Sequence, residues 1–349
     1  MYRQNSGVRG DRQRQTTRKS QTKKTSNGTK NMSFSPSMRS LLSSGTNISP
    51  SLRCSKEDED KTSFYMGSGL VVDAVQSYSK GDYDAALKSL GTALKTQQLT
   101  LGDVDVCTSH TLGNIGAVYL KMGPDWSTEA IKVLEEALNI KMMLKSETHN
   151  SKLPKECKNI ILYDTLNNLG SAYVLAGDYI QAMACFQDAL KELTTSGTES
   201  INSEDIANTL YNIGNVHCLV GEYDDALFAH MESLEIIQST FGEADAQAAE
   251  ILEKIGAIYM VKEDVDQAMA AFLEALSITK ATLGSEYIDC VPSLYNLAHV
   301  HELKGENEAA MEALTTALNI YQKNIHKKKP VAEGIKEKIQ QKMIDLKND

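Results

Sequence analysis

Histidine and cysteine are the residue types in this sequence whose side chains could act as nucleophiles, general bases or metal ligands. Among the seven histidines, His299 and His301 form a His-x-His pair, but on a helix this spacing turns the two side chains about 200° apart, away from a common ion. His217 and His301 stand where other parts of the chain carry tyrosine, which indicates packing between helices. The remaining histidines have no partner at a ligand spacing, so we expect no metal site: His110, His149, His230 and His326.

The six cysteines are widely separated and include no Cys-x-x-Cys pair, which is typical of reduced thiols and not of a zinc site or a disulfide framework. Cys185 and Cys218 lie in apolar helical patterns without an accompanying histidine and acid. The glycines occur singly, so the sequence contains no phosphate-binding loop. We therefore expect a protein that is not an enzyme and that uses no cofactor and no small-molecule substrate.

Asparagine is the residue type whose spacing does point to binding. A carboxamide both donates and accepts, so it can pair with the N–H and C=O groups of an extended peptide without reading the peptide's side chains. The alternative is that each asparagine bonds only to the neighbouring helix of its own protein. The recurring positions, called the ladder below, are Asn114, Asn168, Asn212, Lys254 and Asn296.

An internal repeat must position the ladder. Two residues after each ladder position stands a small residue, followed three positions later by an aromatic residue or histidine. The successive separations of the small residues are 42, 54, 44, 42 and 42 positions, and periods of this size are typical of solenoids. The small residues are Ala74, Gly116, Gly170, Gly214, Gly256 and Ala298.

Each repeat is expected to form two helices. A glycine inside a helix costs about 1 kcal/mol relative to alanine, so four glycines at one position indicate a close approach between helices. We expect the approaching surface to be the alanine of the second helix: Ala86, Ala130, Ala182, Ala226, Ala268 and Ala310. Between the helices, five repeats carry a glycine suited to a left-handed turn, whereas the fifth carries Glu263 and should turn less sharply.

Taken together, the small-x-x-aromatic, Gly-x-Tyr and Ala-x-x-x-Phe spacings resemble the tetratricopeptide repeat family, in the form of about 42 residues seen in kinesin light chains. The Leu-Gly-Asn repeat proteins are a related interpretation. The resemblance covers residues 66–325 and implies an all-α solenoid of about six helix-turn-helix repeats. It also implies a protein-interaction scaffold.

Members of that family bind peptide backbones at the first-helix position that the ladder occupies here. The resemblance therefore implies a concave groove that binds protein or peptide ligands. Acidic and aromatic residues near the ladder favour ligands with basic or apolar segments. The candidate groove residues are the ladder together with Tyr211, Asn215 and Tyr295.

Two further segments flank the repeats. Residues 331–347 place Val331, Ile335, Ile339 and Met343 at a spacing of four, which predicts a capping helix over the last repeat. Residues 1–62 are rich in serine, threonine and basic residues, which predicts disorder. This segment is interpreted as a solvated extension, an organelle transit peptide, or a nuclear localisation signal around Arg18, Lys19, Lys23 and Lys24.

The charge is divided unevenly along the chain. Residues 1–56 sum to +11, which leaves −21 for residues 57–349 out of the net −10. An acidic body disfavours nucleic acid binding by the solenoid and attracts basic partners, so the basic segment could itself compete for the groove. No apolar run reaches the ~18 residues of a membrane helix, so we expect a cytoplasmic protein.

The sequence thus predicts a scaffold that binds peptide segments of partner proteins. Two alternatives remain open. One is a motor cargo adaptor like kinesin light chains, and the other is nucleic acid binding through the basic segment alone.

Overall fold

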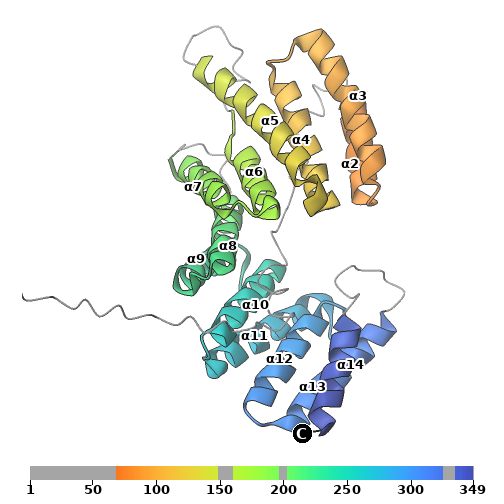
Figure 1. The fold of residues 1–349 in the computed structure, drawn as a ribbon, viewed down its shortest axis with the longest axis vertical. Coiled ribbons are helices and arrows are strands. Elements are labelled where there is room, and N and C mark those ends of the chain that lie inside the picture. The colour runs from red at the N-terminus through yellow and green to blue at the C-terminus, as the bar shows by residue number, and fades with distance from the viewer. Residues whose placement is uncertain (1–67, 148–159, 196–202, 325–334, 349) are drawn as a thin grey trace, which may run out of the picture. The chain divides into compact units, whose positions relative to one another are not determined.

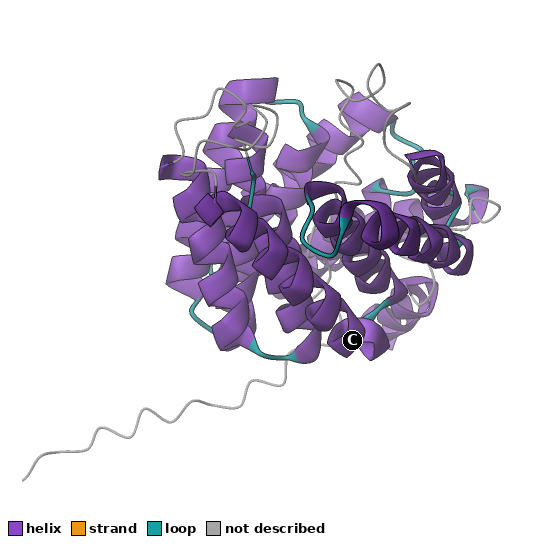
Figure 2. Ribbon diagram, turned by 90° about the horizontal axis from the view of Figure 1, so that it is seen from above, coloured by secondary structure: helices purple, strands orange, loops and turns teal. Residues whose placement is uncertain are grey.

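The computed structural model describes residues 68–147, 160–195, 203–324 and 335–348. Within these ranges the chain forms thirteen α-helices, one short 3-10 helix and no strand (Figures 1 and 2). The all-α prediction is therefore confirmed. The basic segment 1–62, with its three interpretations, lies outside the described residues.

The helices follow one another as six pairs. In the second to sixth pairs the first helix carries a ladder residue. The second helix of every pair carries the recurring alanine of its repeat. The pairs are α2 (Ser68–Ser79) with α3 (Tyr83–Leu101), α4 (Val106–Met122) with α5 (Ser127–Glu147), α6 (Tyr163–Ala176) with α7 (Tyr179–Thr195), α8 (Ser203–Val220) with α9 (Tyr223–Phe241), α10 (Ala246–Val261) with α11 (Val265–Leu283), and α12 (Cys290–Leu303) with α13 (Asn307–Lys323).

Every helix packs against the one before it and the one after it in the sequence. First helices of neighbouring repeats also contact each other, as α4 does with α6 and α6 with α8. The 3-10 helix Pro124–Trp126 lies between α4 and α5 in the second repeat, and its Trp126 ring stacks on Tyr119 with the ring centroids 5.4 Å apart. These contacts between successive elements are those of a solenoid.

The glycines of the first helices do mark close approaches, but the surface they meet differs from the expected one. A Cβ added to Gly170 would lie 2.7 Å from the Phe186 ring, and one added to Gly256 would lie 2.6 Å from Phe272. The residue of the second helix that lies opposite each glycine is thus a large one, one helical turn after the predicted alanine. The alanines themselves are fully buried in the same seam between the paired helices.

Five of the six turns between paired helices share one geometry, including the fifth, whereas the second turn, at Gly123, leads into the 3-10 helix. Gly177 and Gly221 adopt φ values of 80° and 84°, and Glu263 adopts 61°, alone among the described non-glycine residues in having a positive φ. The turn at Glu263 closes with the hydrogen bond from Asp264 N to Tyr259 O at 2.9 Å, the same length as its counterpart from Asp178 N. The looser fifth turn predicted from the sequence is not observed.

The helix α14 (Ile335–Asn348) packs on the last repeat and caps the solenoid, as predicted. Ile339 and Leu346 are buried in the apolar cluster formed with α12 and α13. Lys342 of this helix pairs with Glu302 of α12 and lies 3.3 Å from His299 Nδ1. Val331, the first residue of the expected pattern, lies outside the described residues.

Candidate peptide-binding site on the first helices

Each ladder residue lies on a different first helix, from α4 through α12. Four of the five are buried, with Lys254 only 3% and Asn212 only 4% exposed, while Asn168 is half-buried. The repeat therefore places one polar side chain at the same point of five successive helices.

Two ladder residues differ in how their amide groups are used. Asn296 Nδ2 donates to Glu253 Oε2 of the preceding repeat at 2.7 Å, so this asparagine joins two repeats. The buried Asn212 Oδ1 accepts no hydrogen bond from the residues that the structure describes. A buried acceptor without a partner costs ~1–3 kcal/mol, and Asn167, just before the ladder position of α6, also leaves its Oδ1 without one.

The residue just before the ladder position makes a hydrogen bond to the next repeat. Asn167 Nδ2 donates to Thr209 Oγ1 at 2.9 Å, and Tyr211 Oη donates to Glu250 Oε1 at 2.7 Å. In the following repeat, Glu253 accepts from Ser293. Three successive contacts between first helices thus depend on this position.

Tyr211, expected to line the groove, is instead almost fully buried at 2% exposure. Burial, followed by the negative charge of Glu250, raises the pKa of the Tyr211 phenol well above its usual value. Asn215 is also buried and hydrogen-bonds to Tyr211. Tyr295 is half-buried and packs against the apolar cluster of the last repeats. Tyr211 and Asn215 therefore lie inside the protein, whereas Tyr295 is partly exposed.

The ladder residue on α10, Lys254, has two acidic residues, Glu250 and Glu253, on the same helix. Burial lowers the pKa of Lys254, although the charge of Glu250 acts in the opposite direction. Burial also raises the pKa of Glu253 to about 6, against the hydrogen bonds donated by Ser293 and Asn296. The fourth ladder position therefore places a buried lysine beside the acidic residues Glu250 and Glu253.

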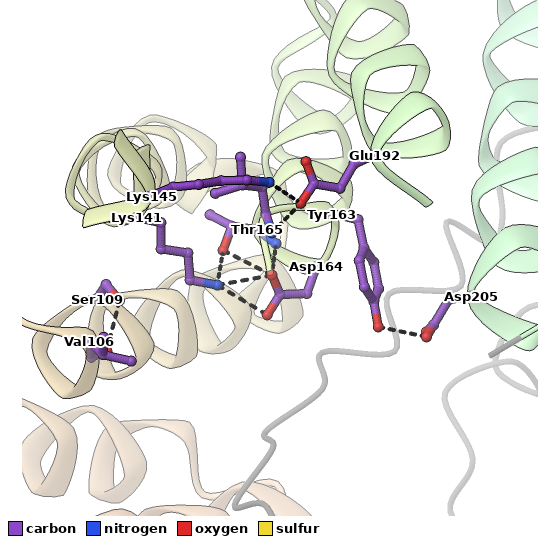
Figure 3. Close-up of polar contacts among 10 residues, drawn as sticks. Val106, Ser109, Lys141, Lys145, Tyr163, Asp164, Thr165, Glu192 and Asp205 are labelled. Carbon is purple, nitrogen blue, oxygen red and sulfur yellow. Dashed lines mark hydrogen bonds and ion pairs between the residues drawn. The ribbon is translucent and has the colours of Figure 1, made fainter. Parts of the chain in front are cut away.

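Lys141 of α5 is a buried polar residue that the sequence analysis did not identify. Its ammonium group donates to Asp164 Oδ1 at 2.9 Å and to Thr165 Oγ1 at 2.7 Å, joining the second and third repeats (Figure 3). Loss of water raises the pKa of Asp164, but the charge and hydrogen bond of Lys141 outweigh this effect and hold the pKa below its usual value. The sequence signal was weak, since the corresponding second-helix position is the apolar Leu193 or Ile237 in two repeats but Gln97 or Thr279 in two others.

Beside this pair, Figure 3 shows two further contacts between neighbouring elements. Lys145 of α5 pairs with Glu192 of α7 at 2.7 Å, and the Tyr163 hydroxyl of α6 donates to Asp205 of α8 at 2.6 Å. The polar side chains near the middle repeats are thus largely engaged with one another.

The histidines that replace tyrosine are half-buried, and each also pairs with a carboxylate. His217 Nδ1 lies 2.7 Å from Glu222 Oε2, and His301 Nδ1 lies 2.6 Å from Glu306 Oε2. His299 contacts Glu302 instead, so the two members of the His-x-His pair have separate partners.

Comparison with known proteins identifies the repeats. A tetratricopeptide repeat family model matches residues 205–259 and 247–323, and a second tetratricopeptide repeat model matches residues 164–192. No curated protein matches the chain.

Several solved structures share the arrangement of helices. BtubC (BKLC) from P. vanneervenii is 17% identical, with a TM-score of 0.52 over 72% of this chain and 91% of that one. The apo form of RapI is 11% identical, with a TM-score of 0.52 over 81% of this chain and 97% of that one. A kinesin light chain-like protein of Podosopora anserina with nearly identical TPR-like repeats is 17% identical, with a TM-score of 0.49 over 62% and 95%.

The fold and these matches define an all-α solenoid of helix pairs. The helix pairs that the two family models match, within residues 164–192 and 205–323, are tetratricopeptide repeats. Such repeats generally act as non-catalytic scaffolds for protein interactions. None of the described helices is both long enough and apolar enough to cross a membrane.

Proposed function

We propose that this protein is a non-catalytic scaffold that binds peptide segments of partner proteins at the ladder of its first helices. The observation that carries the proposal is Asn212, whose buried Oδ1 accepts no hydrogen bond within the described residues. A peptide N–H would supply that bond after the Asn212 side chain turns outward, because Oδ1 is covered by protein atoms in the ligand-free chain. The half-buried Asn168 lies at the same position of the preceding first helix and offers a second amide to the same extended chain.

The ligand is proposed to be basic or to contain basic and apolar residues. The part of the chain from residue 57 onwards carries −21, and Glu250 and Glu253 lie next to the ladder at α10. Opposite charge speeds association and excludes acidic competitors, and this effect weakens as salt is added.

A displayed library of random peptides selected on the full chain would supply the probes. The affinity of the selected peptides would then be measured by fluorescence anisotropy for the unaltered protein and for an Asn168→Ala/Asn212→Ala variant. Two lost hydrogen bonds of about 1 kcal/mol each predict about thirtyfold weaker binding. The matched control is Asn307→Ala, which removes an exposed asparagine at the start of α13.

Equal affinity of the double variant and the control would show that the ladder asparagines have only a structural role. Circular dichroism of each variant establishes that the helices are retained. Failure to select any peptide with the full chain would contradict the proposed function itself.

A further inference from the structure

The turn between α8 and α9 brings together three side chains with metal-binding atoms. His217 lies near the end of α8, Glu222 is the N-cap of α9, and Asp225 lies in its first turn. One ligand atom from each residue lies within 4.8 Å of the other two. His217 and Glu222 are already in contact, at 2.7 Å between Nδ1 and Oε2.

The same turn in other repeats shows that this arrangement departs from ordinary helix capping. In the third and fifth repeats the N-cap is Asp178 or Asp264, whose carboxylate accepts from the backbone N–H of the first turn at 3.1 or 3.2 Å. Glu222 makes no such capping bond. Its longer side chain reaches the imidazole of His217 instead, where the other two repeats carry tyrosine.

The sixth repeat contains the pair but not the third group. His301 and Glu306 are 2.6 Å apart, as close as His217 and Glu222, but the position of Asp225 is occupied by Ala309. Asp224, the acidic neighbour of Asp225, pairs with Lys262 of the next repeat and is already engaged. The fourth repeat therefore combines an imidazole with two carboxylates at one turn.

We propose that His217, Glu222 and Asp225 form a zinc-binding site that links the end of α8 to the start of α9. One imidazole nitrogen and two carboxylate oxygens are normal zinc ligands, with bonds of about 2.0–2.2 Å. Glu222 is 56% exposed, so its side chain can move the short distance needed, and water completes the coordination. Magnesium and calcium prefer all-oxygen sites, so the imidazole selects against them.

The proposed site, if zinc binds, would revise the expectation from the sequence that no histidine takes part in a metal site. His217 and Glu222 are five residues apart, and Asp225 is eight residues from His217. On one continuous helix these separations would not bring the three side chains together. The left-handed turn at Gly221 reverses the chain and brings α9 back beside the end of α8. The site depends on that reversal.

The test measures zinc bound per chain by titration calorimetry of the full protein, with its cysteines kept reduced. His217→Gln is expected to lose one bound zinc ion, whereas His301→Gln, the matched change in the sixth repeat, is expected to lose none. Ala309→Asp is expected to gain one, because it completes the same triad in the sixth repeat. Millimolar magnesium should not displace the ion.

A second measurement separates binding from folding. Zinc should raise the melting temperature of the unaltered protein and of His301→Gln, since a ligand that binds the folded state stabilises it. It should leave that of His217→Gln and Asp225→Ala unchanged. Zinc binding by His217→Gln with undiminished stoichiometry and affinity would overturn the proposal, as would a failure of zinc to bind the unaltered protein.

Discussion

The imidazole of His230 is fully buried in the fourth repeat, in the place that Phe186 and Phe272 occupy in its neighbours. It lies against Gly214, where an added Cβ would approach the ring to 2.8 Å, and it meets the Tyr211 ring edge-on at 5.3 Å. Neither ring nitrogen has a hydrogen-bond partner among the described residues. Burial lowers its pKa to about 3, with further contributions from the charges of Lys254 and His217.

His230→Phe is expected to stabilise the protein by about 1–3 kcal/mol at pH 7, because it removes a buried polar ring without partners and keeps its shape. The gain should increase as the pH falls. The unfolded histidine binds a proton near pH 6.5 and the folded one only near pH 3, so the unaltered protein loses stability below pH 6.5. At pH 5 this adds about 2 kcal/mol to the difference.

Urea unfolding followed by circular dichroism at pH 7.5, 6 and 5 measures both effects. The reciprocal change Phe272→His, at the same position of the fifth repeat, serves as the control and should destabilise. A stability difference between His230→Phe and the unaltered protein that stays constant over this range would show that His230 is protonated equally in both states.

At the scale of the helix pair, the turn sets how each second helix starts. Glu263 adopts the left-handed conformation that Gly221 and Gly305 adopt in the adjacent repeats. A side chain in that conformation costs roughly 1–2 kcal/mol per residue. The fifth turn keeps its shape because the helices on both sides fix it, with Asp264 capping α11.

Glu263→Gly should therefore raise the free energy of unfolding by about 0.5–1 kcal/mol, because the relief of strain exceeds the larger entropy of glycine in the unfolded chain. Urea unfolding measures the change. The matched reverse substitution, Gly221→Glu in the fourth repeat, should be destabilising by about the same amount. If both substitutions left the unfolding midpoint unchanged, the left-handed turn would not be strained.

At the scale of the whole molecule, charge separates residues 1–56, which sum to +11, from residues 57–349, which sum to −21. A basic segment attached to the same chain is present at high effective concentration, so it should compete with a basic peptide for the acidic repeats. Removing residues 1–62 is then expected to strengthen binding of a selected basic peptide at low salt.

The affinity gain from removing residues 1–62 should disappear by about 1 M salt, where the Debye length is only about 3 Å. Fluorescence anisotropy at a series of salt concentrations, with and without residues 1–62, measures it. Equal affinities at every salt concentration would show that the basic segment does not occupy the ligand site.

The sequence alone was sufficient to predict the repeats, their helix pairs and the capping helix. Those features follow from local causes, because the spacing of small, aromatic and glycine residues determines where a helix forms, which face it buries and where it turns. The position of the ladder on successive first helices follows from the same periodicity.

Only the tertiary structure decided what each side chain contacts. Asn296 and Asn212 stand at the same position of the repeat. Asn296 hydrogen-bonds to Glu253, whereas the Oδ1 of Asn212 accepts no hydrogen bond among the described residues. His230 showed in the sequence only as a polar residue at an apolar position, and Lys141 stands at a position where other repeats carry polar as well as apolar residues. Whether such a residue is buried, paired or exposed depends on the distance between helices of different repeats, and that distance is set by the packing of all their side chains together.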